Sequence, residues 1–415
     1  MTDFDCVVIG GGMVGAASAL ALAEQGLKVA VIEKYQPQTF TNEQALDLRV
    51  SAISLASQYL LEQLGAWSQI KQWRACPYKR LGVWEQEYAY TEFNAQDIEK
   101  PHLGHIIENR LIQLALWQQI AVHDKVTLYC PEHLVDLTQD EENVTLTLSE
   151  RTITAKLVVG ADGVNSQVRK LVHIGITSWD YQQSAMLINI ETTQAQQDIT
   201  WQQFFPTGPI AFLPLTREPL AKIPLSKEDS LNHKEQVKAN GYASLVWYHQ
   251  RDEIKRLVAL SNSQLRQEVL AHFPKRLGDI KVIDKASFEL TRRHANNYQK
   301  NRVLLLGDAA HTINPMAGQG VNLGFKDVKA LQEVIACAIA EGKCWHDAKV
   351  LTQYEKMRRN DNLLMQSTMD ALYFSFSHPS LLVKSLRNIS LLAINKLPVV
   401  SGMIKNRALA YACGL

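Results

Sequence analysis

The feature that most constrains this chain is a glycine-rich turn, GGGMVG at Gly10–Gly15, which lies between an apolar run and a stretch of small residues. The residues Phe4–Ile9 are apolar and β-branched, which predicts a buried strand. Met13–Ala23 predicts a helix, and a second apolar run, Lys28–Ile32, ends at Glu33. The order strand, turn, helix, strand is typical of a Rossmann-like dinucleotide-binding unit.

Each glycine of this turn has a physical reason. Gly10 permits a tight turn, Gly12 lets the backbone approach a pyrophosphate, and Gly15 lets the helix pack closely on the strand. Glu33, eighteen positions after Gly15, is placed to accept hydrogen bonds from a ribose 2′-hydroxyl. The motif alone leaves FAD and NAD open. The residues that it assigns to the dinucleotide are Gly10, Gly12, Met13, Val14, Gly15, Glu33 and Lys34.

Two further glycine-containing motifs also follow predicted strands. GADGVNSQVR at Gly160–Arg169 follows Leu157–Val159, and GDAAH at Gly307–His311 follows Val303–Leu306. An Asp at a strand end can bind a ribityl or ribose hydroxyl, and a Gly-rich turn that opens a helix can direct N–H groups at a flavin ring. Taken singly, each motif is explained as well by a helix-capping Asp and a turn glycine.

Composition excludes several classes of protein. The chain has 415 residues, more than one compact core usually holds, and 46% of them are apolar. This excludes a small disulfide-stapled fold and a largely disordered chain. Lys and Arg number 43 against 42 for Asp and Glu, so there is no global field that would draw the protein onto nucleic acid.

The cysteines and the N-terminus indicate where the protein resides. The six cysteines are scattered, with no metal-ligand spacing, so we expect free thiols in a reducing compartment and no metal site. The N-terminus carries acid where a signal peptide needs Lys or Arg, and no apolar run is long enough to cross a membrane. We therefore expect a cytoplasmic protein.

The middle of the chain predicts a second domain. Tyr181–Phe288 is rich in aromatic residues with Pro and Gly between them, which favours an antiparallel sheet. Parallel-strand character returns at Arg302–Leu306, and helical patterns run from Val321 onward. We expect a mixed α/β fold: a Rossmann-like domain of separated segments, an inserted antiparallel-sheet substrate domain and a C-terminal helical region. The expected boundaries are 1–75, 104–178 and 290–345 for the first domain, 76–103 and 179–289 for the second, and 346–415 for the third.

Together, in this order and at these separations, the three motifs resemble the class A FAD-dependent aromatic hydroxylases, which have the para-hydroxybenzoate hydroxylase fold. The resemblance implies FAD as the cofactor, NADH or NADPH as a transient reductant that needs no second nucleotide domain, and dioxygen as co-substrate. It also implies oxygen transfer from a flavin C4a-hydroperoxide to an electron-rich ring. No metal site and no nucleophile motif accompany the three motifs, so the flavin itself is expected to carry the chemistry.

The same resemblance assigns residues by position. Asp162 and Gly163 are expected near the pyrophosphate, and in the family this motif is also linked to the nicotinamide cofactor. Gly307 and Asp308 are expected to hold the ribityl chain. The other residues that it assigns to FAD are Arg49, Asn109, Pro315, Gly318, Gly320, Val321 and Asn322. Because Arg110 follows Asn109 directly, the alignment with the family at this point is certain only to within one position.

Four further segments narrow the resemblance to the ubiquinone-biosynthesis branch of the family. They are Cys76–Arg80, Thr200–Phe204, Ser244–Tyr248 and Met369–Tyr373. The resemblance implies hydroxylation of the ring of a polyprenyl benzoquinol, demethoxyubiquinol. A sister hydroxylase that acts at another ring position, or a flavin-bound subunit of the biosynthetic complex without turnover, stays open. Thr216–Gly241 looks longer than the family's connection, so nothing about substrate entry is carried over there.

The substrate side of the site needs a dry, apolar wall, because water destroys the reactive oxygen species. Aromatic residues of the sheet domain are candidates for this wall, although an ordinary sheet core explains most of them equally well. No catalytic base is assigned; His311 is a weak candidate for moving a proton and is more readily explained as a histidine that holds its loop. The six aromatic candidates are Trp201, Phe204, Phe205, Phe212, Trp247 and Tyr248.

The C-terminal region is basic and apolar. No Asp or Glu follows Asp370, whereas five basic residues do. This composition favours peripheral contact with an anionic membrane face or docking to partners of a ubiquinone-biosynthesis complex. A helical tail packed on its own core, with a solvated basic edge, is an equally good interpretation. The five residues are Lys384, Arg387, Lys396, Lys405 and Arg407.

Overall fold

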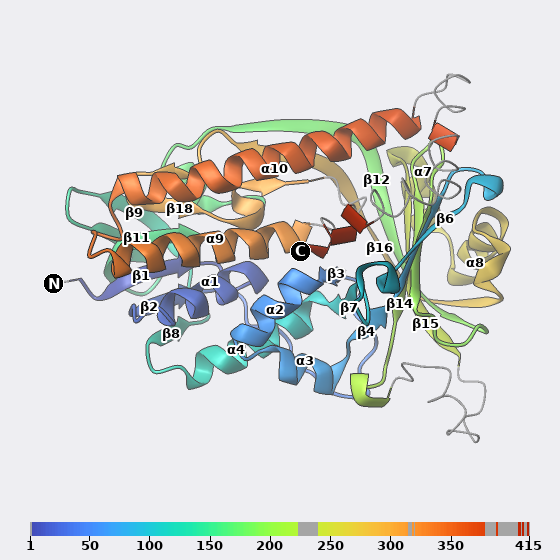
Figure 1. Cartoon of the computed structure of the whole chain (residues 1–415), viewed down its shortest axis with the longest axis horizontal. Coiled ribbons are helices and arrows are strands. Elements are labelled where there is room, and N and C mark those ends of the chain that lie inside the picture. The colour runs from blue at the N-terminus through green and yellow to red at the C-terminus, as the bar shows by residue number, and fades with distance from the viewer. Residues whose placement is uncertain are drawn as a thin grey trace.

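The computed structural model describes residues 2–222, 240–313, 318 and 320–377, with four short pieces near the C-terminus at 387–388, 406–407, 409–410 and 413–414. Figure 1 shows two units side by side: a three-layer unit that holds the N-terminus, and a twisted antiparallel sheet beside it. The long helix α10 (Ala348–Ser377) runs along the first unit and reaches the second.

A largely parallel sheet forms the centre of the first unit. Its main path has the order β17-β18-β11-β1-β2-β8, and β9 and β10 extend it antiparallel from β11. Helix α1 (Met13–Ala23) packs on this sheet between α4 (Asn109–Val122) and α9 (Gly320–Ala340). The strands are β1 (Phe4–Ile9), β2 (Val29–Ile32), β8 (Val126–Tyr129), β9 (Leu134–Gln139), β10 (Val144–Leu148), β11 (Thr152–Gly160), β17 (Gln299–Lys300) and β18 (Val303–Leu305).

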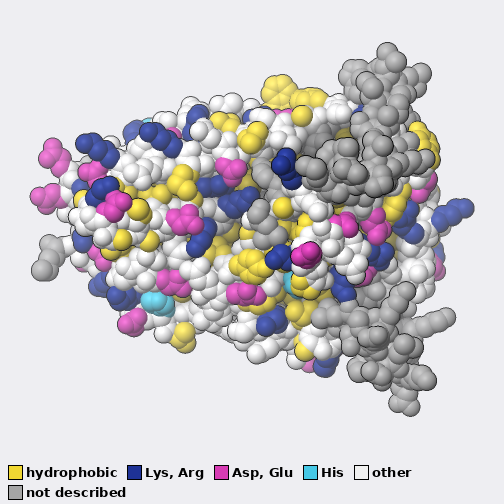
Figure 2. Space-filling view, viewed as in Figure 1, with side chains coloured by type: hydrophobic (Ala, Val, Ile, Leu, Met, Phe, Trp, Pro, Cys, Tyr) yellow, Lys and Arg dark blue, Asp and Glu magenta, His cyan; other side chains and the backbone are white. Residues whose placement is uncertain are grey.

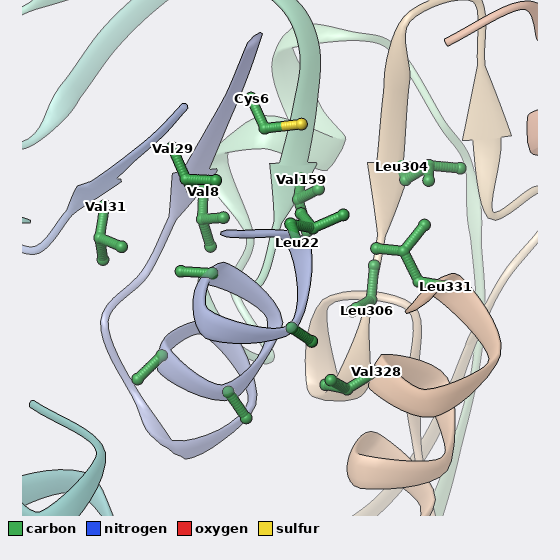
Figure 3. Close-up of a cluster of buried hydrophobic side chains, with 14 of the residues drawn as sticks. Cys6, Val8, Leu22, Val29, Val31, Val159, Leu304, Leu306, Val328 and Leu331 are labelled. Carbon is green, nitrogen blue, oxygen red and sulfur yellow. The ribbon is translucent and has the colours of Figure 1, made fainter. Parts of the chain in front are cut away.

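The central strands of this sheet are buried, which explains why their residues are apolar. Cys6 and Val8 of β1 are completely buried, and so are Val29 of β2 and Val159 of β11. Leu22 of α1 lies among them, and Figure 3 shows these side chains converging between the sheet and the helices. Each fully buried aliphatic side chain of this size contributes about 1.5–3 kcal/mol. The apolar runs on which the sequence predictions depended are therefore the core of the unit.

A small antiparallel sheet, three α-helices and one short 3-10 helix also belong to the first unit. The sheet has the order β3-β7-β4. A buried ion pair between Arg74 and Glu108, with an Nη1–Oε1 distance of 3.4 Å, ties the loop before β3 to β7, because Arg74 also donates to the carbonyls of Asn42 and Gln44. The elements are β3 (Val50–Ser54), α2 (Leu55–Gln63), α3 (Trp67–Trp73), β4 (Cys76–Tyr78), β7 (Gly104–Glu108), α5 (Gln167–Leu171) and the short helix η5 (Gly307–Ala309).

The second unit is an eight-stranded sheet with the order β19-β16-β12-β15-β14-β13-β5-β6. Two helices, α7 (Arg251–Ala259) and α8 (Asn262–His272), cover one face of it. The strands are β5 (Arg80–Trp84), β6 (Thr91–Asn94), β12 (Ile176–Thr192), β13 (Ile199–Gln203), β14 (Ile210–Leu215), β15 (Gly241–Gln250), β16 (Ile280–Ala295) and β19 (His311–Thr312). Short 3-10 helices lie at Glu87–Ala89, Ala95–Ile98, Leu220–Lys222 and Lys275–Leu277.

Alternation along the strands gives this sheet two different faces. The outer face, under α7 and α8, carries a cluster of large aromatic and aliphatic side chains. The inner face is turned toward the first unit, because Asn189 on it donates to the backbone carbonyls of Leu46 and Asp47. We name its apolar patch the inner-face cluster; its buried members are Tyr181, Ala185, Ala211, Val246, Tyr248 and Leu290.

Helix α10 joins the two units along its length. Near its start, the Tyr354 hydroxyl donates to the carbonyl of Leu305 in β18, at 3.0 Å. Farther along, Gln366 donates to the carbonyls of Arg293 and Thr312. Near its end, Asp370 is bonded by both Tyr181 and Arg292 of the sheet. One helix therefore contacts the parallel sheet at one end and the antiparallel sheet at the other.

The mixed α/β architecture predicted from the sequence is confirmed. The strand at Phe4–Ile9 and the helix at Met13–Ala23 have the expected bounds. The three-part domain division stays a prediction; β12 and β16 both run across its boundaries. The long connection at Thr216–Gly241 lies mostly outside the described residues, since 223–239 are not among them.

The described pieces of the C-terminal tail pack on the protein. Arg387 is buried and donates from Nη2 to Oε1 of the buried Glu85 at 2.7 Å, and Asn388 donates to the same carboxylate. Leu409 and Cys413 lie in an apolar cluster with Leu55 and others. These contacts match the packed-tail interpretation at these positions. Of the other basic tail residues, Arg407 is exposed, and Lys384, Lys396 and Lys405 lie outside the described residues.

On the face shown in Figure 2, basic and acidic side chains are interspersed. None of the six cysteines forms a disulfide. Within the described ranges, no helix has the length and apolarity to cross a membrane, and no group of side chains is arranged as metal ligands.

The Arg387–Glu85 pair makes a testable prediction. Removal of one partner of a buried ion pair leaves the other charge without compensation, at a cost of about 3–5 kcal/mol. We expect Arg387→Leu to lower the free energy of unfolding by that amount. The matched control Arg407→Leu, at an exposed tail position, should change it by less than about 0.5 kcal/mol. Urea unfolding measures both, and equal effects of the two variants would contradict the prediction.

Candidate cofactor and substrate site

The three glycine-rich motifs begin where neighbouring parallel strands end. Ile9, the last residue of β1, lies opposite Gly160 of β11 and opposite Ile32 of β2. Gly160 in turn lies opposite Leu305 of β18. Because the carboxyl ends of parallel strands meet at one edge of a sheet, the turns after them are gathered there, which is where open α/β sheets bind their ligands.

The first turn is close-packed on one side and open on the other. A Cβ atom on Gly15 would lie 1.8 Å from the carbonyl oxygen of Gly10, and one on Gly10, where φ is +102°, would lie 2.5 Å from that of Ala161. A Cβ on Gly12 would meet nothing within 4 Å. Gly12 is also the N-cap residue of α1, and no side chain caps the helix there. The N-terminus of α1 therefore lies next to the open space at Gly12. This is the cradle that a pyrophosphate needs.

Glu33 and helix α4 fix the middle of this turn. Glu33 accepts hydrogen bonds from the backbone N–H of Gly11 through Oε2, at 2.7 Å, and of Tyr35 through Oε1, at 2.9 Å. The carbonyl of Gly11 accepts from Trp117 Nε1 and Gln113 Nε2, at 2.7 and 2.9 Å. Trp117 and Gln113 were not expected from the sequence. They lie one helical turn apart on α4, a spacing that is equally common in ordinary helices.

The remaining residues of the first motif are less specific. Met13 and Val14 are half-buried and pack against the core. Lys34 is exposed, with Nζ 5.1 Å from the ring centroid of Tyr35.

Asp162 binds the first N–H groups of α5, whose N-cap residue is Ser166, through only one of its oxygens. Oδ2 accepts from the backbone N–H groups of Gln167 and Val168, at 2.6 and 3.1 Å. Oδ1 is buried and has no hydrogen-bond partner in the described structure. Gly163, the next residue, has φ +78°, and a Cβ there would meet nothing within 4 Å. The space beside Gly163 fits close approach of a ligand to the backbone.

Asp308 lies in the turn after β18 and is exposed. The surrounding protein raises the pKa of its carboxyl, and the charges of His311 and Arg49 oppose this rise only in part. The exposed Arg49 therefore contributes positive charge near Asp308.

A buried carboxylate holds the turn that carries Asp308. Asp327 of α9 accepts from the backbone N–H of Gly307 at 2.9 Å and lies 2.6 Å from His311 Nε2. Its other oxygen accepts from Arg358 Nε at 2.7 Å and from Asn362. This arrangement matches the loop-holding interpretation of His311. Asp327 was not among the residues expected from the sequence, because a single acid in a long helix carries no distinctive signal.

The loop after β19 is only partly described, and Pro315 lies outside the described residues. Gly318 has φ +61°, and its Cβ would lie 3.4 Å from that of Ala52. Gly320 is open and Val321 packs on the core. Asn322 is buried and accepts from the backbone N–H of Ser54 at 3.0 Å, so its side chain joins α9 to β3.

At the start of α4, the two neighbouring candidates differ. Asn109 accepts a hydrogen bond from the Ser51 hydroxyl at 2.7 Å. Arg110 forms two hydrogen bonds to Asp47 and reaches the carbonyl of Gln38, so it secures the loop before β3.

The six aromatic candidates for the substrate wall are divided between the two faces of the sheet. Trp201, Phe212 and Trp247 are buried on the outer face, with Phe205 packed against them. Trp201 and Phe212 stack there with ring centroids 5.4 Å apart. These four residues form the ordinary sheet core that was the alternative interpretation. The other two, Tyr248 and Phe204, lie with the inner-face cluster, and Phe204 stacks on Phe376 of α10.

The network around Asp327 predicts a pH dependence. Burial by itself would raise the pKa of Asp327, but His311 and Arg358 lower it to about 2. An unfolded Asp titrates near 3.9, so the charged group adds stability above about pH 4, and this stability is lost as the pH falls toward 2. We expect Asp327→Asn to cost about 3–5 kcal/mol at neutral pH. The difference from wild type should shrink below about pH 4 in urea unfolding; a difference that grows there would contradict the prediction.

Comparison with known proteins agrees with this geometry. Residues 3–362 match the family model described as FAD binding domain. Over 412 residues the chain is 42% identical to the 3-demethoxyubiquinol 3-hydroxylase of Escherichia coli, covering 99% of this chain and 98% of that protein. It is 32% identical to the ubiquinone hydroxylase UbiL of Rhodospirillum rubrum, with 99% and 89% covered. It is also 32% identical to the human mitochondrial ubiquinone biosynthesis monooxygenase COQ6, with 99% and 92% covered.

Solved structures share the fold. The p-nitrophenol 4-monooxygenase PnpA of Pseudomonas putida superposes with a TM-score of 0.74 at 19% identity, covering 98% of this chain and 96% of that one. PqsL of Pseudomonas aeruginosa gives 0.71 at 20% identity, covering 90% and 96%. With motifs, fold and full-length similarity in agreement, the chain belongs to the family of FAD-dependent monooxygenases that carry this FAD binding domain.

Proposed function

We propose that this protein hydroxylates the ring of a polyprenyl quinol, demethoxyubiquinol, in ubiquinone biosynthesis. The observation that carries the proposal is the similarity to the E. coli 3-demethoxyubiquinol 3-hydroxylase, which extends over both units at 42% identity. The convergence of the three glycine motifs at one sheet edge supports it.

FAD is the cofactor of the family, and the residues at the sheet edge fit it. The open side of Gly12 and the N-terminus of α1 would take the pyrophosphate, and Glu33 the ribose. Asp308, an exposed carboxylate that feels the positive charge of Arg49, would take the ribityl hydroxyls. Bound FAD, once reduced by NADH or NADPH, supplies dioxygen activation and delivery of one oxygen atom to the substrate ring.

The inner-face cluster would hold the substrate ring. Its members are apolar apart from the two tyrosines, and burial raises the pKa of Tyr248 above its usual range, so the phenol stays neutral. A neutral, largely apolar wall excludes water from the reacting atoms. The quinol ring is already electron-rich through its oxygens, so the proposal needs no strong protein base.

A sister reaction at another ring position is the second candidate. The similarity to UbiL and COQ6, at 32% identity over 99% of this chain, favours keeping this candidate, because the names of these relatives specify no ring position. A flavin-bound subunit without turnover is a further alternative. A ubiquinone-biosynthesis complex as partner, a peripheral membrane contact and a cytoplasmic location all stay predictions.

The function is tested in two steps. First, the absorbance spectrum of the purified protein should show bound flavin, and NAD(P)H oxidation should be stimulated by demethoxyubiquinol. Second, the chain should restore ubiquinone in a strain that lacks the 3-hydroxylase. Restoration only in a strain that lacks a different ring hydroxylase would favour the sister reaction. Bound flavin with no stimulation by any quinol would favour the subunit without turnover.

The role proposed for Glu33 predicts a specific loss. The carboxylate holds Gly11 and would bind the ribose, and a hydrogen bond to a charged group is worth about 1.5–3 kcal/mol. We expect Glu33→Ala to raise the dissociation constant for FAD by about 10- to 100-fold. Glu43→Ala, an exposed change in the same connection, is the matched control. Titration of the apoprotein with FAD measures both; wild-type affinity in Glu33→Ala would remove Glu33 from the site.

Two neighbouring residues of β15 lie on opposite faces of the sheet, so substitutions at them test the two faces separately. Trp247 lies in the outer-face core and Tyr248 in the inner-face cluster. We expect Trp247→Leu to lower stability by about 2–4 kcal/mol with little change in KM for the quinol. Tyr248→Leu should raise KM or uncouple NAD(P)H oxidation from hydroxylation. The reverse assignment of the two effects would contradict the proposed substrate face.

A further inference from the structure

The turn that carries Asp308 does not hold itself in place. Gly307, where φ is +56°, directs its backbone N–H at Asp327 Oδ2, at 2.9 Å. His311, four residues later, reaches the same oxygen through Nε2, at 2.6 Å. One carboxylate oxygen therefore binds the turn at both of its ends. The ionised carboxylate can only accept, so His311 donates from Nε2.

The other oxygen of Asp327 faces away from the turn. Oδ1 accepts from Arg358 Nε at 2.7 Å and from Asn362 Nδ2 at 3.3 Å, and both donors belong to α10. Arg358 also donates to Asp361 at 2.6 Å. Asp327 is completely buried. The carboxylate thus has a turn side and a helix side, and substitutions can address them separately.

The same turn is in contact with the first glycine motif. A Cβ on Gly307 would lie 3.4 Å from the side chain of Val14, and one on Gly324, a helical turn before Asp327, would lie 2.5 Å from it. Helix α9 therefore approaches α1 closely, and the turn is held between them. A shift of Asp327 along α9 would move Gly307 and, with it, the neighbouring Asp308.

From this geometry we propose that Asp327 is a positioning residue for FAD. Through the Gly307 N–H and His311, it sets the place at which the Asp308 carboxylate meets the cofactor. The inference rests on the proposed assignment of Asp308 to the cofactor. It assigns to Asp327 a function in addition to joining α9 to α10, which is what its bonds to Arg358 and Asn362 do.

The test compares variants of the two sides in the full-length apoprotein. Asp327→Asn and His311→Gln both disturb the turn side, and Asp327→Asn disturbs the helix side as well, because it removes the charge that pairs with Arg358. Arg358→Lys disturbs the helix side alone, and Asp308→Ala reports the proposed cofactor contact. Thermal unfolding without FAD gives the structural cost of each, and titration with FAD gives the dissociation constant. The visible spectrum of the bound flavin reports its surroundings.

We expect Asp327→Asn and His311→Gln to raise the dissociation constant at least tenfold and to shift the flavin spectrum. Arg358→Lys should change the dissociation constant less than threefold, even if it lowers thermal stability as much as the other two variants do. Should Asp327→Asn not fold, His311→Gln decides, since it leaves the Asp327–Arg358 pair intact. Losses of FAD affinity that follow the loss of stability across all variants would overturn the inference.

The inference and the proposed site fail in different ways. Wild-type affinity in Asp308→Ala would overturn the cofactor contact itself, and the inference with it. Weakened binding in Asp308→Ala together with wild-type affinity in both turn-side variants would overturn the inference alone.

Discussion

The rest of the structure depends on one constraint, the parallel pairing of β1 with β11 on one side and with β2 on the other. This pairing brings Ile9, Gly160 and Ile32 into register, and β18 continues it through Leu305. Segments separated by up to three hundred residues therefore end at one edge. The close approach of Gly15 to the Gly10 carbonyl then fixes α1 against that edge. A cofactor site follows from strand order before any side chain is considered.

The second unit is placed by a different kind of contact. Its sheet meets the first unit through Asn189, which donates to the backbone before β3, and through α10. With these contacts in place, the inner-face cluster faces the first unit, while α7 and α8 cover the outer face. The aromatic residues of this sheet therefore fall into two groups: some form the core under the helices, and a few face the first unit.

Much of the fold could be predicted from the sequence, because its signals are local. The bounds of β1 and α1 and the position of Glu33 follow from short-range pattern. The face on which Trp201 or Tyr248 lies depends on pairing with distant strands, and alternation alone does not say which face meets which unit. Asp327 gave no signal, since its partners lie on other elements. The pairing of Arg387 with Glu85, 302 residues away, is equally invisible to local pattern.

Helix α10 has a consequence for the energetics of the two ligands. It is bonded to Leu305 and Asp327 in the first unit and, through Asp370, to Tyr181 in the second. If a quinol bound at the inner face displaces this helix, the affinity for FAD changes by the factor by which FAD changes the affinity for the quinol, because linkage between binding equilibria is reciprocal.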